Sequence, residues 1–189
     1  MMLRGGIGKR FLEERMRRGP ILRRLRDRFF RASTMILDPD QTWVQLRKDF
    51  EKSEFIVLMI SPFLSRQMVK KFLDFSEVKS ALERGVNVKV LTKPSKEIKN
   101  SKEHQNCIQM LEENDIHVEP IDRLHFKAAF LDDEGSLSIA YIGSVNLLSV
   151  ITVKGVPEDY MLRFESEALI DELASQLKGL KLYKHLGLE

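Results

Sequence analysis

The stretch Glu54–Ile60, with the sequence EFIVLMI, constrains the fold more than any other part of the chain. After the glutamate its apolar residues follow one another without a break. Such a run predicts a strand that is buried on both faces of a largely parallel sheet. A sheet of this kind must be covered by other layers, so the run favours an α/β fold.

The neighbouring segments predict the other elements of that fold. Asp38-Pro39 combines a capping residue with a proline suited to the first helical position, and it starts a predicted helix that ends near Glu51. Val86–Leu91 alternates as a second strand, and Ser166 caps a final helix. Further short strands are predicted at 116–119 and 160–164. The order of elements predicts a layered α/β sandwich, with a central mixed β-sheet flanked by helices.

Size and composition limit the classes of protein that are possible. A chain of 189 residues can bury one full core, and 43% hydrophobic with 31% charged residues describes a globular protein. Cys107 is the single cysteine, so we expect neither a disulfide within the chain nor a cysteine-based zinc cluster, and a reducing, cytoplasmic setting. No apolar run has the length of a membrane span, and no secretory signal is expected.

The positive charge is concentrated at the N-terminus. Residues 1–31 contain eleven Lys or Arg against three acidic residues. We therefore divide the chain into a basic amphipathic helical arm, residues 1–31, and one globular domain, residues 32–189. The arm could dock on its own domain or on a second copy, or it could bind a nucleic-acid backbone. Membrane attachment is less favoured because the arm lacks Trp and has a narrow apolar face. A linker remnant and an organellar presequence are further alternatives.

The stretch Leu124–Asn146 carries the candidate chemistry. Read in steps of two, it begins as a strand with His125 and Lys127 side by side on one face. The opposite face is apolar and carries Leu124, Phe126, Ala128 and Phe130. After a turn, a second strand leads to Ser144 and Asn146, so hairpin pairing would bring all four polar side chains together. A nucleophile or base, a fixed positive charge and two neutral donors suit an anionic oxygen on phosphorus or carbon.

The spacing of these residues resembles the HxKxxxxD…GSxN signature of the phospholipase D superfamily. His125, Lys127 and Asp132 match its first part, and Gly143 to Asn146 match its second part. Ten residues separate Asp132 from Gly143, which predicts a longer hairpin than is usual in that family. Ser61-Pro62-Phe63 and the segment 84–91 also resemble the pattern upstream of the motif, so the resemblance covers roughly residues 36–178.

The resemblance implies phosphodiester chemistry through a phosphohistidine, without a metal or another cofactor. His125 would attack phosphorus, while Lys127, Ser144 and Asn146, with Gly143, would hold the phosphate oxygens. A second imidazole would protonate the leaving oxygen. The chain has one such motif, so we expect a homodimer in which His125 of the partner subunit supplies that imidazole.

An acidic residue should orient each imidazole. Glu158 matches the acid that follows GSxN in the family, and it is our first candidate. Asp132 is the acid of the motif, but its position beside the turn makes a backbone role equally plausible. His104 and Cys107 are spaced as a helical ligand pair, for which we predict a surface position without a metal. His117 and His185 are interpreted as structural or solvated.

Three functions remain open at this point. Compact size, a single motif and the basic arm resemble the small dimeric nucleases of the superfamily, which favours a nuclease acting on DNA or RNA. Lys93, Lys96, Lys99 and Lys102 lie in or next to a loop at the expected crevice and could bind a phosphate backbone, although solvated lysines are the simpler interpretation. The alternatives are a phospholipid-cleaving enzyme and a nucleic-acid-binding accessory module without turnover.

Overall fold

The computed structural model describes residues 34–133, 136–149, 159–177, 179 and 181–186. The predicted arm, residues 1–31, lies outside these ranges. The strands are β1 (Thr34–Leu37), β2 (Ile56–Ile60), β3 (Asn87–Thr92), β4 (His117–Pro120), β5 (Ala128–Asp133), β6 (Ser136–Gly143) and β7 (Met161–Glu165). The helices are α3 (Pro39–Lys52), α4 (Arg66–Asp74), α5 (Ser76–Glu83), α6 (Ser101–Glu112), α7 (Glu167–Gln176) and α8 (Leu182–Leu186), with a 3₁₀ turn η1 (Ser95–Glu97).

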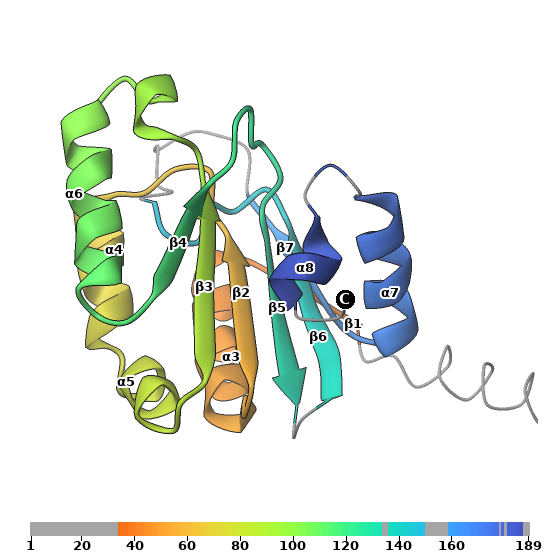
Figure 1. The fold of residues 1–189 in the computed structure, drawn as a ribbon. Helices are drawn as coiled ribbons and strands as arrows, with labels where there is room; N and C mark the ends of the chain where they lie inside the picture. The colour runs from red at the N-terminus through yellow and green to blue at the C-terminus, as the bar shows by residue number, and fades with distance from the viewer. Residues whose placement is uncertain (1–33, 134–135, 150–158, 178, 180, 187–189) are drawn as a thin grey trace, which may run out of the picture.

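The strands form one mixed sheet in the order β1-β7-β6-β5-β2-β3-β4 (Figure 1). The β2/β3 and β3/β4 pairs are parallel, whereas the other pairs are antiparallel. The predicted mixed sheet is confirmed. The largely parallel setting predicted for β2 is wrong on one side, because its neighbour β5 comes from the hairpin and runs antiparallel to it.

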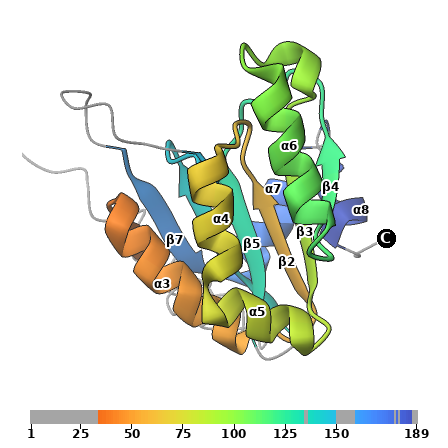
Figure 2. The same ribbon diagram turned by 90° about the vertical axis from the view of Figure 1, so that its left-hand side faces the viewer.

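Helices cover both faces of the sheet. Helices α3, α4, α5 and α6 lie on one face, and α7 and α8 lie on the other (Figures 1 and 2). Along β2, Val57 and Met59 join the core under the first group of helices, while Leu58 and Ile60 join the core under the second group. A strand placed between two cores needs apolar residues at every position, which explains the uninterrupted run in the sequence.

Helix α3 begins as the sequence predicts, at Pro39 after the Asp38 cap. The Asp38 carboxylate accepts the N–H of Gln41 at 2.7 Å, and the Gln41 side chain accepts the N–H of Asp38 at 3.2 Å. This capping box satisfies backbone donors that the first turn leaves unpaired. Strand β1, just before the cap, is not predicted from the sequence. It is a short edge strand on β7 with Ile36 72% exposed, so it lacks the apolar alternation that reveals a strand.

A buried polar network joins α3 to the sheet. The Arg163 guanidinium of β7 donates from Nε and Nη2 to the two carboxylate oxygens of Asp49 in α3, at 2.7 and 2.9 Å. The Tyr141 hydroxyl of β6 also donates to Asp49. All three residues are almost completely buried, and burial together with the Asp49 carboxylate raises the pKa of Tyr141. The network therefore fixes α3 over the two strands that lead to the candidate site.

Candidate active site

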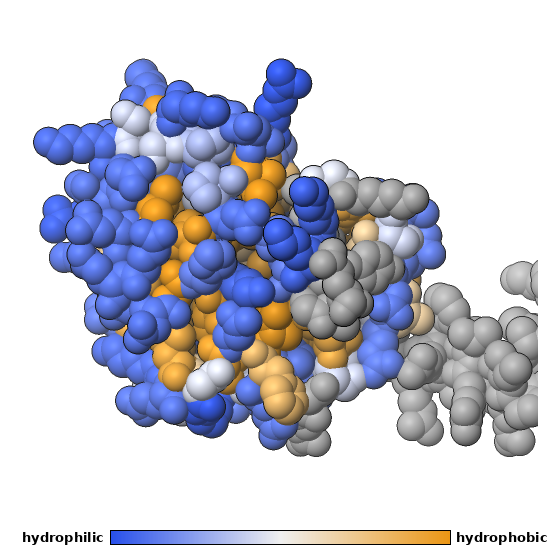
Figure 3. Space-filling view, viewed as in Figure 1, coloured by the Kyte–Doolittle hydropathy of each residue, from blue (hydrophilic) through white to orange (hydrophobic). Residues whose placement is uncertain are grey.

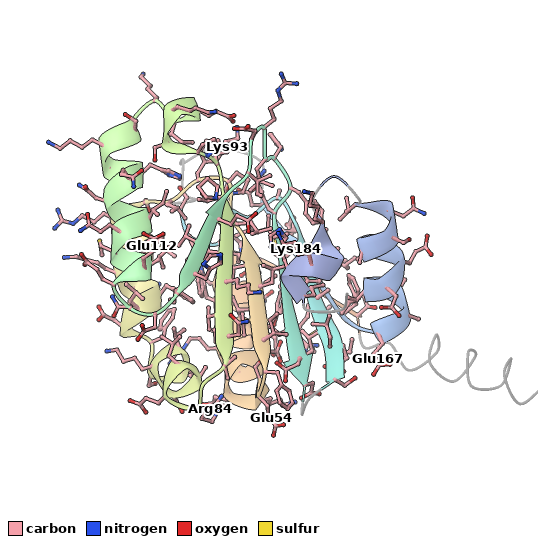
Figure 4. The ribbon with its side chains drawn as sticks, viewed as in Figure 1. Glu54, Arg84, Lys93, Glu112, Glu167 and Lys184 are labelled. Carbon is pink, nitrogen blue, oxygen red and sulfur yellow. The ribbon has the colours of Figure 1, made fainter. Side chains whose placement is uncertain are left out.

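The candidate site lies where β5 begins and β6 ends. The carbonyl of Lys127 accepts the N–H of Gly143 at 3.4 Å, so the two halves of the motif meet across the hairpin. The neighbouring loop after β3 carries Lys93, which Figure 4 places at the upper end of the strands. Glu54, before β2, lies at the lower end. The site therefore occupies the end of the sheet where the parallel strands β2 and β3 finish, as is usual for crevices in α/β folds.

The sequence predicts a strand that begins at Leu124, but β5 begins at Ala128. His125 and Lys127 therefore lie in the loop before the strand. The segment 121–127 leaves β4 at one edge of the sheet and must pass β3 and β2 to reach β5, so it has no adjacent strand to pair with. The predicted apolar face is nevertheless confirmed, because Leu124 and Phe126 pack with Ala128 and Phe130 in the core under α7 and α8. This packing turns the His125 side chain toward solvent.

The Lys127 ammonium lies against His125. Its Nζ is 3.5 Å from Nδ1 of the ring and donates to the His125 carbonyl at 2.9 Å. Burial lowers the pKa of Lys127, the Asp159 carboxylate counteracts this shift, and the Lys93 ammonium adds to it. The structure therefore gathers an imidazole, two ammonium groups and one carboxylate. Such a group has positive charge available for an anionic phosphate.

Gly143 and Ser144 hold the start of β7 against the end of β6. Ser144 donates its backbone N–H to the Tyr160 carbonyl at 3.0 Å, and its hydroxyl oxygen accepts the N–H of Tyr160 at 3.1 Å. A Cβ on Gly143 would lie 2.1 Å from that same carbonyl, so a larger residue cannot fit there. This close approach gives Gly143 a packing role, and its predicted role in substrate binding stays a prediction.

Asn146 follows β6 in a loop anchored by buried Val145 and Leu147. Its Oδ1 is buried and has no hydrogen-bond donor among the described residues. A buried acceptor without a donor is costly and marks a position where another group can complete the bonding. Asn146 therefore remains a candidate for contact with a substrate hydroxyl or with the imidazole of a partner.

The sequence-based choice for the orienting acid is Glu158. Glu158 lies outside the described residues, so its predicted role is a proposal only. Its neighbour Asp159 is described, and its charge acts on Lys127. Asp159 is not among the acids chosen from the sequence. Within the described residues it is a carboxylate whose charge reaches the site.

Asp132 lies at the opposite end of β5 from the candidate site. Its carboxylate accepts the backbone N–H groups of Glu54, Phe55 and Ile56, at 2.8–3.1 Å. It is separated from Ala128 by about 13 Å along the strand. The assignment of Asp132 to the catalytic group is therefore wrong. Its role is structural, because it satisfies backbone donors where the chain enters β2.

The predicted row of lysines does not form one cluster. Lys93 is half-buried and acts on Lys127, whereas Lys96 pairs with Asp122 at 3.3 Å on the surface. Lys99 and Lys102 are exposed. Within the described ranges no three His, Cys, Asp or Glu side chains are arranged to hold a metal ion, and no helix has the length and apolar composition needed to cross a bilayer.

His104 and Cys107 of α6 are buried, so their predicted surface position is wrong. Helix α6 packs on the sheet through the face that carries them. Nε2 of His104 lies 2.9 Å from the Lys93 carbonyl, so the neutral ring carries its proton on Nε2 and donates it to that oxygen. His104 therefore holds the backbone of Lys93, the residue whose ammonium acts on Lys127 at the site.

Acid is expected to destabilise the protein through His104. Burial lowers the pKa of His104, so the unfolded chain binds a proton at a higher pH than the folded chain. The free energy of unfolding should therefore fall as the pH drops below about 6.5. Urea unfolding between pH 8 and pH 5 should show a smaller loss for His104→Gln than for the wild type. The exposed His117→Gln serves as control, and an unchanged pH slope in His104→Gln would contradict this role.

The comparisons with known proteins agree with this geometry. The model of the family described as "Cardiolipin synthase, PLD-like domain" matches residues 46–180, more than two thirds of the chain. The chain belongs to this phospholipase D-like family. The resemblance inferred from the motif is thus confirmed, and it assigns the chain to a phosphodiesterase superfamily. No curated protein sequence matches the chain.

Solved structures show that the phospholipase D-like domain has the fold of that superfamily. Nuc from Salmonella typhimurium, a phospholipase D family member, superposes with a TM-score of 0.56 at 13% identity, covering 78% of this chain and 92% of Nuc. NucT from Helicobacter pylori gives 0.59 at 15%, covering 79% and 96%. A phosphatidylserine synthase from Haemophilus influenzae gives 0.54 at 11%, but only 38% of that chain is covered.

Proposed function

We propose that the protein is a metal-independent phosphodiesterase that cleaves DNA or RNA through a phosphohistidine on His125. The observation that carries the proposal is the exposed His125 ring with the Lys127 ammonium 3.5 Å from its Nδ1. An accessible nucleophile beside a fixed positive charge suits attack on an anionic phosphodiester. Membership of the phospholipase D-like family supports the same chemistry.

The reaction proceeds in two displacements. In the first, an imidazole nitrogen of His125 forms a bond to phosphorus and the bond from phosphorus to the leaving oxygen breaks. A second imidazole gives its proton to that oxygen. In the second displacement, the same imidazole removes a proton from water, the water oxygen bonds to phosphorus, and the phosphorus–nitrogen bond breaks. Lys127 neutralises charge on the nonbridging oxygens in both steps, with Ser144 and Asn146 as further proposed donors.

The second imidazole is proposed to be His125 of the partner subunit. The sequence contains one HxK pattern, and His104 and His185 are buried away from solvent. The chain covers nearly all of Nuc and NucT but little more than a third of the phosphatidylserine synthase. The chain is thus similar in length to Nuc and NucT and carries one motif. It therefore needs a second copy to complete a site with two imidazoles.

Nucleic acid is the favoured substrate because the chain contains basic residues that suit a phosphate backbone. Residues 1–31 are strongly basic in sequence, and Lys93 adds a second ammonium beside Lys127. Phospholipid is the second candidate, favoured by the cardiolipin synthase description of the family and by the similarity in fold to a phosphatidylserine synthase. A cytoplasmic location, inferred from the single Cys107, stays a prediction.

A cleavage panel with excess EDTA tests the proposal. Single-stranded DNA, duplex DNA, RNA, phospholipid vesicles and bis(4-nitrophenyl) phosphate are incubated with the wild type, and sedimentation velocity is measured at micromolar concentration. We expect a dimer that cleaves nucleic acid in EDTA. Cleavage that requires added Mg²⁺ would contradict the phosphohistidine route, and a strict monomer would contradict the composite site. Turnover of vesicles alone would favour the lipid function.

A further inference from the structure

Two aromatic rings lie exposed next to the candidate site. Phe63, in the loop after β2, is 37% exposed, and Tyr160, at the start of β7, is 42% exposed. Tyr160 is fixed to the motif because its backbone N–H and carbonyl both bond to Ser144. Large aromatic groups are normally removed from water, so their exposure at a site that attracts phosphate needs an explanation.

The loop that carries Phe63 is also fixed to the site. The buried Ser61 hydroxyl donates to the Phe63 carbonyl at 3.0 Å and accepts the N–H of Leu148 at 3.1 Å, from the loop that follows Asn146. On its other side the Pro62 carbonyl accepts the backbone N–H of Lys93 at 3.3 Å. The loop is therefore held between the second half of the motif and the end of β3, and its ring does not depend on a mobile segment for its position.

A positive charge accompanies the Phe63 ring. Lys93 Nζ lies 5.1 Å from the ring centroid, within the range of a cation–π contact. The same ammonium helps to lower the pKa of Lys127, so its charge acts at the candidate site. The aromatic ring is thus accompanied by a positive charge that is coupled to the proposed phosphate site.

We propose that Phe63 and Tyr160 are base-stacking positions, with Lys93 binding an adjacent phosphate, and that the substrate is single-stranded nucleic acid. The inference rests on the proposed function. In a duplex the bases stack on one another and are closed to protein side chains, whereas an unpaired strand exposes a π-face at every base. Stacking is tolerant of sequence, so cleavage should depend on strandedness more than on base identity.

The surroundings favour a nucleic acid over a lipid surface. A membrane-binding surface needs a contiguous apolar patch, often rimmed by basic residues. The upper end of the face shown in Figure 3, where the loop after β3 lies, is mostly hydrophilic. An exposed ring with an ammonium beside it, as at Phe63 and Lys93, is instead an arrangement that binds a base and the neighbouring phosphate together.

Binding measurements on a His125→Ala background test the proposal, because bound substrate is then not cleaved. Fluorescence anisotropy with a labelled single-stranded 12-mer (a length of about one binding groove) should give a Kd that rises between about fivefold and a hundredfold in Phe63→Ala and in Tyr160→Ala. Phe63→Trp and Tyr160→Phe, which keep a ring, should stay near the parent value. Phe55→Ala is the matched control, since Phe55 is a 62% exposed ring before β2, at the other end of the sheet.

The outcomes separate this inference from the proposed function. Loss of single-strand affinity in the alanine variants, retained in the aromatic variants, supports the stacking role. Equal affinity in Phe63→Ala, Tyr160→Ala and Phe55→Ala overturns it, as does preferential binding of duplex or of vesicles. Hydrolysis of bis(4-nitrophenyl) phosphate by the wild type in EDTA tests the proposed function by itself, because this diester has no nucleobase. If it is hydrolysed while the rings prove irrelevant, only the single-strand inference fails.

Discussion

His125→Ala is expected to lower the rate of phosphodiester cleavage by at least about 10³-fold, because it removes both the proposed nucleophile and the proposed general acid. The ring is exposed, and it contacts the Lys127 ammonium rather than the core. The variant should therefore keep the fold and the oligomeric state of the wild type. Single-turnover cleavage of a labelled oligonucleotide in EDTA measures the loss, and thermal unfolding with sedimentation confirms that the fold is intact.

A mixed dimer makes this prediction sharper. Coexpression with two affinity tags yields dimers that carry one His125→Ala copy and one wild-type copy. If both imidazoles serve one composite site, the mixed dimer should be almost inactive, whereas two independent sites would leave half of the activity. His117→Ala removes another exposed imidazole, on β4, and should keep full activity. Half activity in the mixed dimer would contradict the composite site, and a loss of much less than about 10³-fold in the pure variant would contradict the role of His125.

The parts of the fold that can be predicted from the sequence are those determined by residues close together in the chain. The run in β2 is apolar at every position because two cores enclose it, and the Asp38 cap is complete within four residues. Strand β1 could not be predicted in this way, because its conformation depends on pairing with β7, which is far away in the chain. The same holds for the direction of β5 beside β2, which is decided by the hairpin and not by the apolar pattern.

In the candidate site, too, some residues can be predicted from the sequence and others depend on contacts between distant parts of the chain. His125, Lys127 and Ser144 are recognised from spacing alone, because the chemistry requires these groups close together in a hairpin. The position of Asp132 depends on which backbone donors lie opposite it, and these belong to residues more than seventy positions earlier in the chain. Burial of His104 could have been suspected from the apolar residues spaced around it on α6. A histidine three residues before a cysteine also has the spacing of a helical metal-ligand pair, so the spacing alone does not indicate burial.

Asp49 is the residue whose loss should affect stability most. Its carboxylate neutralises Arg163 and accepts the Tyr141 hydroxyl, and the side chains of Asp49 and Arg163 are 1% and 2% exposed. Arg163 also pairs with Glu165 at 2.7 Å, but that carboxylate is 38% exposed and screened by solvent. Tyr141 and Arg163 each lie two residues from the strand ends at Gly143 and Met161. The network thus links α3 packing to the position of the motif.

Asp49→Ala is expected to reduce the free energy of unfolding by about 3–5 kcal/mol, because it leaves a buried guanidinium and a buried hydroxyl without their main acceptor. That loss is a large part of the roughly 5–15 kcal/mol that stabilises a typical domain. Urea denaturation followed by circular dichroism measures it, at one fixed protein concentration because the proposed dimer would make the apparent stability concentration-dependent.

Two further variants decide whether the orphaned charge or the lost packing causes the effect. Lys52→Ala removes a partly exposed ion pair with Asp133 at the end of the same helix, and it should cost less than about 1 kcal/mol. The triple variant Asp49→Leu, Tyr141→Phe, Arg163→Met replaces every polar group of the network by an apolar one. Since no buried charge then remains, it should be more stable than Asp49→Ala. A triple variant as unstable as Asp49→Ala would assign the loss to packing, and an Asp49→Ala protein as stable as Lys52→Ala would show that α3 is held without the network.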